Sequence, residues 1–203
     1  DYDPIGVDDD GTLYVVRPQG VNGEAVLARF DFASGLPEAM PLVSAPGFDF
    51  QGQLILDRPR SRALGVRIET DAEQTIWFDP ALQALQKLAD SALPGRVNRI
   101  RCRRCGAPDM IALVRSFSDR DPGRLLIYDA KLKNWQTVSS MMADIDPRQM
   151  ASVDMKRIKA RDGRELPVWL TLPQGVKPGH PAPAVVMVHG GPWVRGGHWR
   201  WEP

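Results

Sequence analysis

The feature that most constrains the fold is a pattern that occurs three times within residues 1–150. In each copy a short β-rich run ends in arginine, and an aromatic residue followed by aspartate comes 11 to 14 residues later. The spacing is 50 residues from Arg17 to Arg67 and 48 from Arg67 to Arg115. A period near fifty with two strands per copy predicts blades of a β-propeller, with chance likeness among β-hairpins as the alternative. The copies are residues 13–17 with Phe30 and Asp31, residues 64–67 with Phe78 and Asp79, and residues 111–115 with Tyr128 and Asp129.

The second copy differs from the other two in the residues after its aspartate. Turn residues come after the first and third copies, at positions 33–35 and 131–134, and suit an outer hairpin. After the second copy, Asp79 and Pro80 have the character of an N-cap and a first helical residue. Apolar residues then recur at helical spacing up to Leu93-Pro94-Gly95, at Leu82, Leu85, Leu88, Ala89 and Ala92. We therefore predict one inserted amphipathic helix near residues 79–93, packed by its leucine face.

The last fifty residues have a different organisation. Residues 155–160 and 166–172 predict two strands joined by the Asp162-Gly163 turn. A Gly/Pro/Lys-rich connection leads to the apolar run 184–188, which predicts a strand buried on both faces of a parallel sheet. His189-Gly190-Gly191-Pro192-Trp193 comes directly after this run.

A glycine pair after such a strand predicts half of an oxyanion hole. In α/β-hydrolases a loop after the third strand supplies one backbone NH to the oxyanion, and the residue after the nucleophile supplies the other. Pro192 has no NH, so Gly190 or Gly191 must donate, and we favour Gly191. The alternative is a simple tight turn.

Three segments together resemble the start of the catalytic domain in prolyl-oligopeptidase-family (S9) serine peptidases, especially acylaminoacyl peptidases and dipeptidyl-aminopeptidase-like enzymes. They are residues 161–163, 167–173 and 189–193, and the resemblance covers roughly residues 153–203. It implies a mainly β chain: a partial β-propeller of about three blades over residues 1–150, then the first strands of an α/β-hydrolase domain over residues 151–203. The implied function is hydrolysis of short peptides by acyl transfer.

The catalytic triad of such an enzyme is missing from these residues. The family places a Gly-x-Ser-x-Gly elbow, then aspartate, then histidine, after the oxyanion strand. The sequence has no Gly-x-Ser-x-Gly, and every serine precedes His189. We therefore expect these residues to be part of a longer serine-type peptidase and to be inactive by themselves.

Aromatic residues and an arginine come after the glycine pair. Trp193 and Arg195 are candidates for substrate contact, because under the resemblance they overhang the active-site cavity. The alternative is that Trp193, Trp199 and Trp201 pack the two domains against each other, since large aromatics dominate interfaces as well as pockets.

Composition argues against several other classes of partner. The net charge is +1, from 26 basic and 25 acidic residues, so no global charge favours nucleic acid or membrane binding. The arginine-rich stretch 96–104 alternates with Ile100 and Cys102 and predicts one solvated strand face without base-stacking aromatics. No apolar run approaches the roughly twenty residues of a membrane span. Asp8-Asp9-Asp10-Gly11 predicts a polar turn before a strand, since its register does not fit an EF-hand.

No cofactor or metal is expected. Cys102 and Cys105 form a single C-x-x-C without a second ligand pair, and two reduced cysteines are expected if the protein is cytosolic. The compartment itself is left open by the sequence, as is a homo-oligomeric state.

Two other functions are compatible with the sequence. A carboxylesterase-like hydrolase also uses His-Gly-Gly, although that lineage usually has glycine or alanine in place of Pro192 and has no propeller. A non-enzymatic propeller module would bind partners through its blades.

Overall fold

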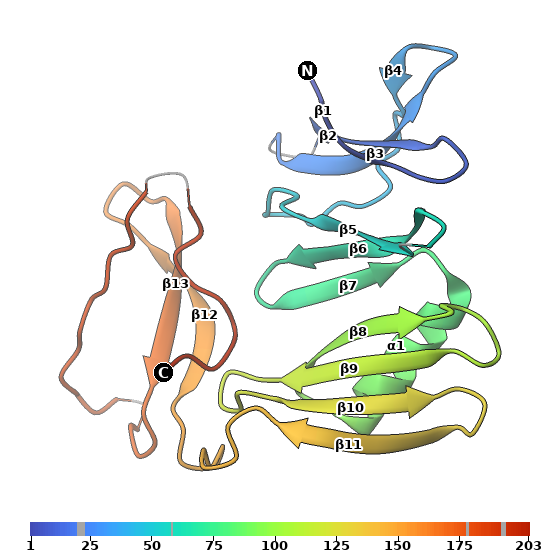
Figure 1. Cartoon of the computed structure of the whole chain (residues 1–203). Coiled ribbons are helices and arrows are strands. Elements are labelled where there is room, and N and C mark those ends of the chain that lie inside the picture. Colours follow the sequence, from blue (N-terminus) through green and yellow to red (C-terminus); the bar gives the residue numbers. More distant parts are fainter. Residues whose placement is uncertain (20–22, 58, 178, 192–193) are drawn as a thin grey trace.

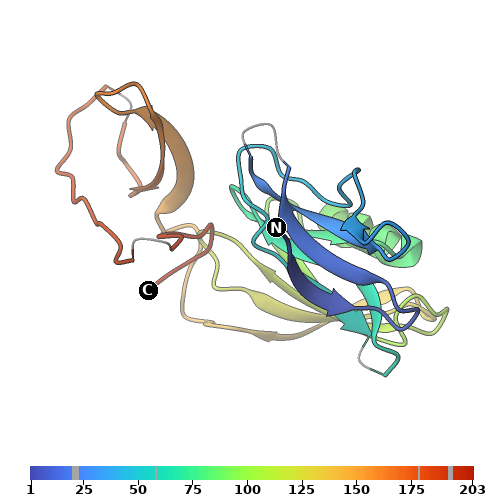
Figure 2. The same ribbon diagram turned by 90° about the horizontal axis from the view of Figure 1, so that it is seen from above.

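The computed structural model describes residues 1–19, 23–57, 59–177, 179–191 and 194–203. This part of the chain is mainly β, with small antiparallel sheets and one helix. Three sheets succeed one another along the chain and lie in a row, and a separate hairpin stands beside them (Figure 1). The hairpin and the helix lie on opposite sides of the row, as Figure 2 shows from above.

Each sheet is a simple meander in which chain neighbours pair. The first contains β1 (Asp3–Val7), β2 (Leu13–Pro18), β3 (Ala25–Asp31) and β4 (Leu36–Pro37). The second contains β5 (Gln53–Asp57), β6 (Arg62–Glu69) and β7 (Glu73–Trp77). The third contains β8 (Val97–Arg103), β9 (Ile111–Phe117), β10 (Arg124–Asp129) and β11 (Asn134–Ser140), and the hairpin pairs β12 (Ser152–Lys159) with β13 (Glu165–Leu172).

The sequence repeat coincides with one strand pair in each of the three sheets. Its copies lie on β2 and β3, on β6 and β7, and on β9 and β10, except that Phe78 and Asp79 come directly after β7, and each pair is antiparallel. Gly65 in the second copy allows close strand approach, because a Cβ there would lie 2.4 Å from the Ile76 carbonyl oxygen. The predicted mainly β class and the repeated strand pairs are therefore confirmed, and the propeller stays a prediction.

Two apolar cores hold the row of sheets together. One joins the first and second sheets through Tyr14, Leu27, Phe50, Val66 and neighbouring residues. The other joins the second sheet, the helix and the third sheet, and Leu64, Leu82, Ile100 and Val114 are at most 2% exposed in it. Side chains so fully buried each stabilise the fold by roughly 1.5–3 kcal/mol.

The predicted helix is present as α1 (Pro80–Ala92) and comes after β7, where the first and third sheets add a fourth strand (Figure 1). Asp79 caps it by accepting hydrogen bonds from the backbone NH groups of Ala81 and Leu82. The buried face is narrower than predicted. Leu82, Leu85 and Ala89 are buried, but Leu88 is 44% exposed and Ala92 is exposed, because both lie at the margin of the apolar stripe.

The strand expected at residues 184–188 is not formed. These residues have no strand hydrogen bonding, and Val185, Val186, Met187 and Val188 are 86–91% exposed. A parallel strand buried on both faces needs strands beside it and helices over it, and no described segment supplies them. The predicted hairpin is confirmed as β12 and β13, with Gly163 at φ 84° in its turn, but no α/β-hydrolase region is evident in the described residues.

Two expectations for the arginine-rich stretch on β8 need correction. Cys102 and Cys105 are joined in a disulfide, not left as two thiols, because the chain folds back after the strand through Arg104 and Gly106, both at positive φ. The solvated face is confirmed for Arg101 and Arg103, which are exposed, but it does not extend to Arg96 and Arg99. Arg96 pairs with the buried Asp121 in the loop between β9 and β10, and Arg99 pairs with Glu73 of the second sheet.

Candidate functional site

The predicted oxyanion glycines lie in an exposed, irregular segment. Gly190 has open space where a Cβ would stand, and Gly191 has a φ of 148°, which is favourable for glycine. The Nδ1 atom of His189 lies 2.7 Å from the Gly190 carbonyl oxygen. Pro192 and Trp193 lie outside the described residues. No contact of the glycine pair with a nucleophile is present among the described residues, and the oxyanion role of the pair stays a prediction.

Arg195 contacts the row of sheets. Its guanidinium donates hydrogen bonds to the carbonyl oxygens of Glu69 and Thr70, in the turn between β6 and β7. The same group lies 5.8 Å from the centroid of the Phe48 ring and 5.7 Å from that of Trp169. Here Arg195 ties the C-terminal segment to both the second sheet and the β12–β13 hairpin.

Two further contacts hold the same segment. The Nδ1 atom of His198 lies 2.6 Å from Oε1 of Glu69, and the Trp201 amide donates to the Ser118 carbonyl oxygen at 2.8 Å. Trp199 and Trp201 are both partly buried. The printed contacts are made by the Arg195 and His198 side chains and by the Trp201 backbone, so both interpretations of the tryptophan side chains stay predictions.

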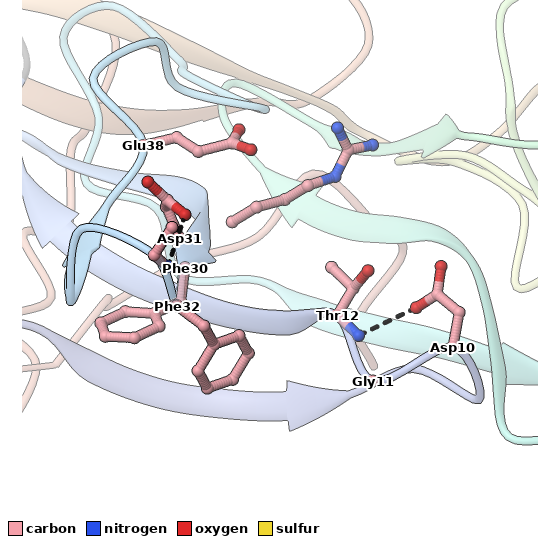
Figure 3. A pocket seen from close by; sticks show the side chains of 9 residues that line it. Asp10, Gly11, Thr12, Phe30, Asp31, Phe32 and Glu38 are labelled. Carbon is pink, nitrogen blue, oxygen red and sulfur yellow. Dashed lines mark hydrogen bonds between the residues drawn. The ribbon is translucent and has the colours of Figure 1, made fainter.

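An open pocket of about 390 Å³ lies over the first sheet (Figure 3). Its two aspartates form local turns: Asp10 accepts from the Thr12 amide and Asp31 from the Ala33 amide, both at 2.9 Å. Hydrogen bonds from Ser34 and Ala33 lower the pKa of Asp31. The lining residues are Asp10, Gly11, Thr12, Arg29, Phe30, Asp31, Phe32, Ala33 and Glu38.

A neighbouring pocket of about 460 Å³ contains Asp8, which links the first two sheets. Asp8 accepts hydrogen bonds from the Ala63 amide at 2.8 Å and from the Tyr14 hydroxyl at 3.0 Å. Burial raises the pKa of Asp8, but these bonds outweigh burial and the pKa is lowered overall. Burial and the bond to Asp8 raise the pKa of Tyr14 to about 12.

Neither pocket contains catalytic machinery for acyl transfer. The residues that line them include no serine, cysteine or histidine, so neither pocket contains a Ser–His or Cys–His pair. Within the described part of the chain, no three or more His, Cys, Asp or Glu side chains gather to hold a metal ion, and no helix is long and apolar enough to span a bilayer.

A cationic cluster that was not predicted from the sequence runs across the second and third sheets. Arg67 on β6 and Arg99 on β8 both pair with Glu73 on β7, and the Arg67 Nε lies 3.2 Å from the Glu73 Oε1. Arg99 and Arg115 are paired residues on β8 and β9, and both guanidinium groups pack on the Phe117 ring. We call Arg67, Arg99 and Arg115 the guanidinium row. The sequence signal was available, since Arg67 and Arg115 are two of the three repeat arginines.

Comparison with known proteins identifies a distant relative. The chain is 27% identical over 210 aligned positions to dipeptidyl aminopeptidase BIII of Pseudoxanthomonas mexicana. The alignment covers 98% of this chain and 30% of that protein, so the chain spans less than a third of the relative's length. No protein-family model and no solved structure matches the chain. The chain is therefore a distant homologue of part of a dipeptidyl aminopeptidase.

Proposed function

We propose that this chain is part of a prolyl-oligopeptidase-like serine peptidase that releases dipeptides or other short units from peptides. The observation that carries the proposal is the alignment with a dipeptidyl aminopeptidase, because it extends over 98% of the chain. It therefore includes both the repeated sheets and the His-Gly-Gly segment. The sheets would be blades of a propeller that limits access to short peptides, and residues 151–203 would begin the catalytic domain.

In this proposal the glycine pair acts on the developing negative charge. A serine attacks the peptide carbonyl, and the carbonyl oxygen becomes an oxyanion that the backbone NH of Gly191 stabilises. The serine, the aspartate and the histidine of the triad would come from residues outside this sequence. The exposed run 184–188 would become a sheet strand once neighbouring strands are present, because burial on both faces requires them.

The test uses the full-length protein and a fluorophosphonate probe, which labels activated serines. Labelling together with turnover of a dipeptidyl substrate is the expected result. Gly191→Pro removes the donor and should lower kcat by about a hundredfold to a thousandfold. Gly191→Ala keeps the NH and is the control for the strain that a side chain meets at a φ of 148°, so it should lower kcat less. Unchanged turnover in Gly191→Pro would contradict the oxyanion assignment. Absence of labelling would contradict the peptidase and favour the non-enzymatic propeller module.

A further inference from the structure

The guanidinium row carries more positive charge than its surroundings neutralise. Three guanidinium groups, of Arg67, Arg99 and Arg115, lie along it, and one carboxylate, that of Glu73, binds two of them. Glu69 lies close enough to stabilise the charge of Arg99, but it is already in contact with His198 and Arg195. Arg101 adds a further positive charge near Arg67. The local balance therefore favours an additional anion.

Arg115 is the least satisfied member of the row. Its Nε atom is buried without a hydrogen-bond partner, and the side chain has no hydrogen bond or ion pair with any residue that the structure describes. Its described contact is with the Phe117 ring, 5.2 Å from the ring centroid. The Arg115 side chain is only partly buried and its charge has no acidic partner among the described residues, so an anion could reach its terminal NH groups.

Arg67 shows the same shortage of acceptors. Its Nε atom is close to Glu73 but not aligned for a hydrogen bond. Burial lowers the pKa of Arg67, Glu73 opposes this, and the neighbouring charges of Arg99 and Arg101 lower the pKa further. A second carboxylate near the row would relieve that repulsion.

The geometry also indicates which anion fits. Arg99 holds Glu73 through two parallel bonds, from Nε to Oε1 and from Nη2 to Oε2, which is the fork arrangement that guanidinium groups form with carboxylates. Arg115 lies opposite Arg99 on the paired strand, so its donors face the same side of the sheet. Phe117 supports both guanidinium planes, which restrains their orientation.

We propose that the guanidinium row is a binding site for a carboxylate group of a small molecule or peptide, held by Arg115 together with the free donors of Arg99 and Arg67. The site lies near the ends of β6 and β9 that point toward the β12–β13 hairpin (Figure 1). It depends only on side chains of the second and third sheets, so it does not rest on the proposed peptidase activity.

The test is a titration of the full chain with N-acetylalanine and with N-acetylalanine amide at matched ionic strength. The two probes differ in the carboxylate alone, so we expect the acid to bind at least tenfold more tightly than the amide. A third titration, with sodium acetate, distinguishes a free carboxylate ion from the carboxylate of an acylated amino acid or peptide. Binding equal to that of N-acetylalanine would assign the site to free carboxylate ions, and weaker binding would assign it to an acylated amino acid or peptide end.

Arg115→Gln is the informative variant, because it removes a charge that has no described ion-pair partner and leaves the Glu73 pairs in place. We expect it to weaken N-acetylalanine binding about tenfold. Arg103→Gln is the matched control, since Arg103 is an exposed arginine at the other end of β8, and it should change the affinity less than twofold. Equal affinity for the acid and the amide, no binding of either, or equal effects of the two variants would overturn the proposal.

Discussion

Buried charged side chains fix the loops at the strand ends, and Asp121 is the clearest case. It is 8% exposed, accepts a hydrogen bond from the Gly123 amide at 2.8 Å and pairs with Arg96. Burial raises the pKa of Asp121, but Arg96, the Gly123 amide and Arg124 outweigh burial, so the pKa lies below its ordinary value of 3.8. The ionised form is therefore the one that stabilises the fold.

Because the folded-state pKa is depressed, the stabilisation by Asp121 is present above pH 3.8 and is lost as the pH falls below it. We expect Asp121→Asn to lower the free energy of unfolding by about 1.5–3 kcal/mol at pH 7, the usual worth of hydrogen bonds to charged groups. The difference from the native protein should shrink at pH 3. Urea unfolding at both pH values measures this difference. Asp146→Asn is the control, because Asp146 pairs with the exposed Arg148, and it should lower the free energy of unfolding less than Asp121→Asn does. A difference that grows at pH 3 would contradict the assignment.

At the scale of elements, α1 takes the place that a fourth strand occupies in the first and third sheets. Its apolar face completes the core between the second and third sheets. Polar bonds add to this, since Asn98 on β8 donates to Asp90 at 3.0 Å and to the Leu93 carbonyl oxygen at 3.2 Å. The helix start is set by Asp79, which also pairs with Arg62 at 3.0 Å.

Loss of the Asp79 cap should therefore destabilise the chain in a graded way. We expect Asp79→Ala to lower the free energy of unfolding by about 1–2 kcal/mol, because two backbone NH groups lose their acceptor. Asp79→Asn keeps an acceptor oxygen and should lose less, since the pair with the partly exposed Arg62 contributes little. Chemical denaturation of the three proteins distinguishes these cases, and equal losses in both variants would show that the charge, not the cap, matters.

At the scale of the whole molecule, residues 195–201 connect the C-terminal segment to the sheets at two turns. Arg195 and His198 contact the turn after β6, and Trp201 contacts Ser118 after β9. The β12–β13 hairpin contributes as well, because the Val153 amide donates to the Asp119 carboxylate at 2.9 Å and Arg157 lies over the Phe48 ring. The hairpin and the sheets are thus held together by a few polar contacts.

Removal of one of these contacts should loosen the segment without unfolding the sheets. In hydrogen exchange measured by mass spectrometry, we expect Arg195→Ala to speed exchange in the peptide 195–203 at least tenfold and to leave β9 and β10 unchanged. Arg200→Ala is the control, because among the described residues the exposed Arg200 pairs only with the nearby Glu202. It should leave the exchange rate of this peptide unchanged. Protection that is equal in all three proteins would show that Arg195 does not hold the segment.

Local patterns in the sequence were sufficient for the strand pairs of the repeat, the Asp162-Gly163 hairpin and the start of α1 at Asp79 and Pro80. Such features depend on turn residues, caps and periodicity within a few positions of the chain, so the sequence by itself determines them. The exposure of Leu88 and the pairing of Arg96 and Arg99 depend on which side chains other elements place nearby. The apolar run 184–188 shows the same limit, since its preference for a strand is met only when partner strands are present. Tertiary structure alone decided these outcomes and the gathering of the guanidinium row, because contacts between residues far apart in the chain depend on the packing of whole sheets.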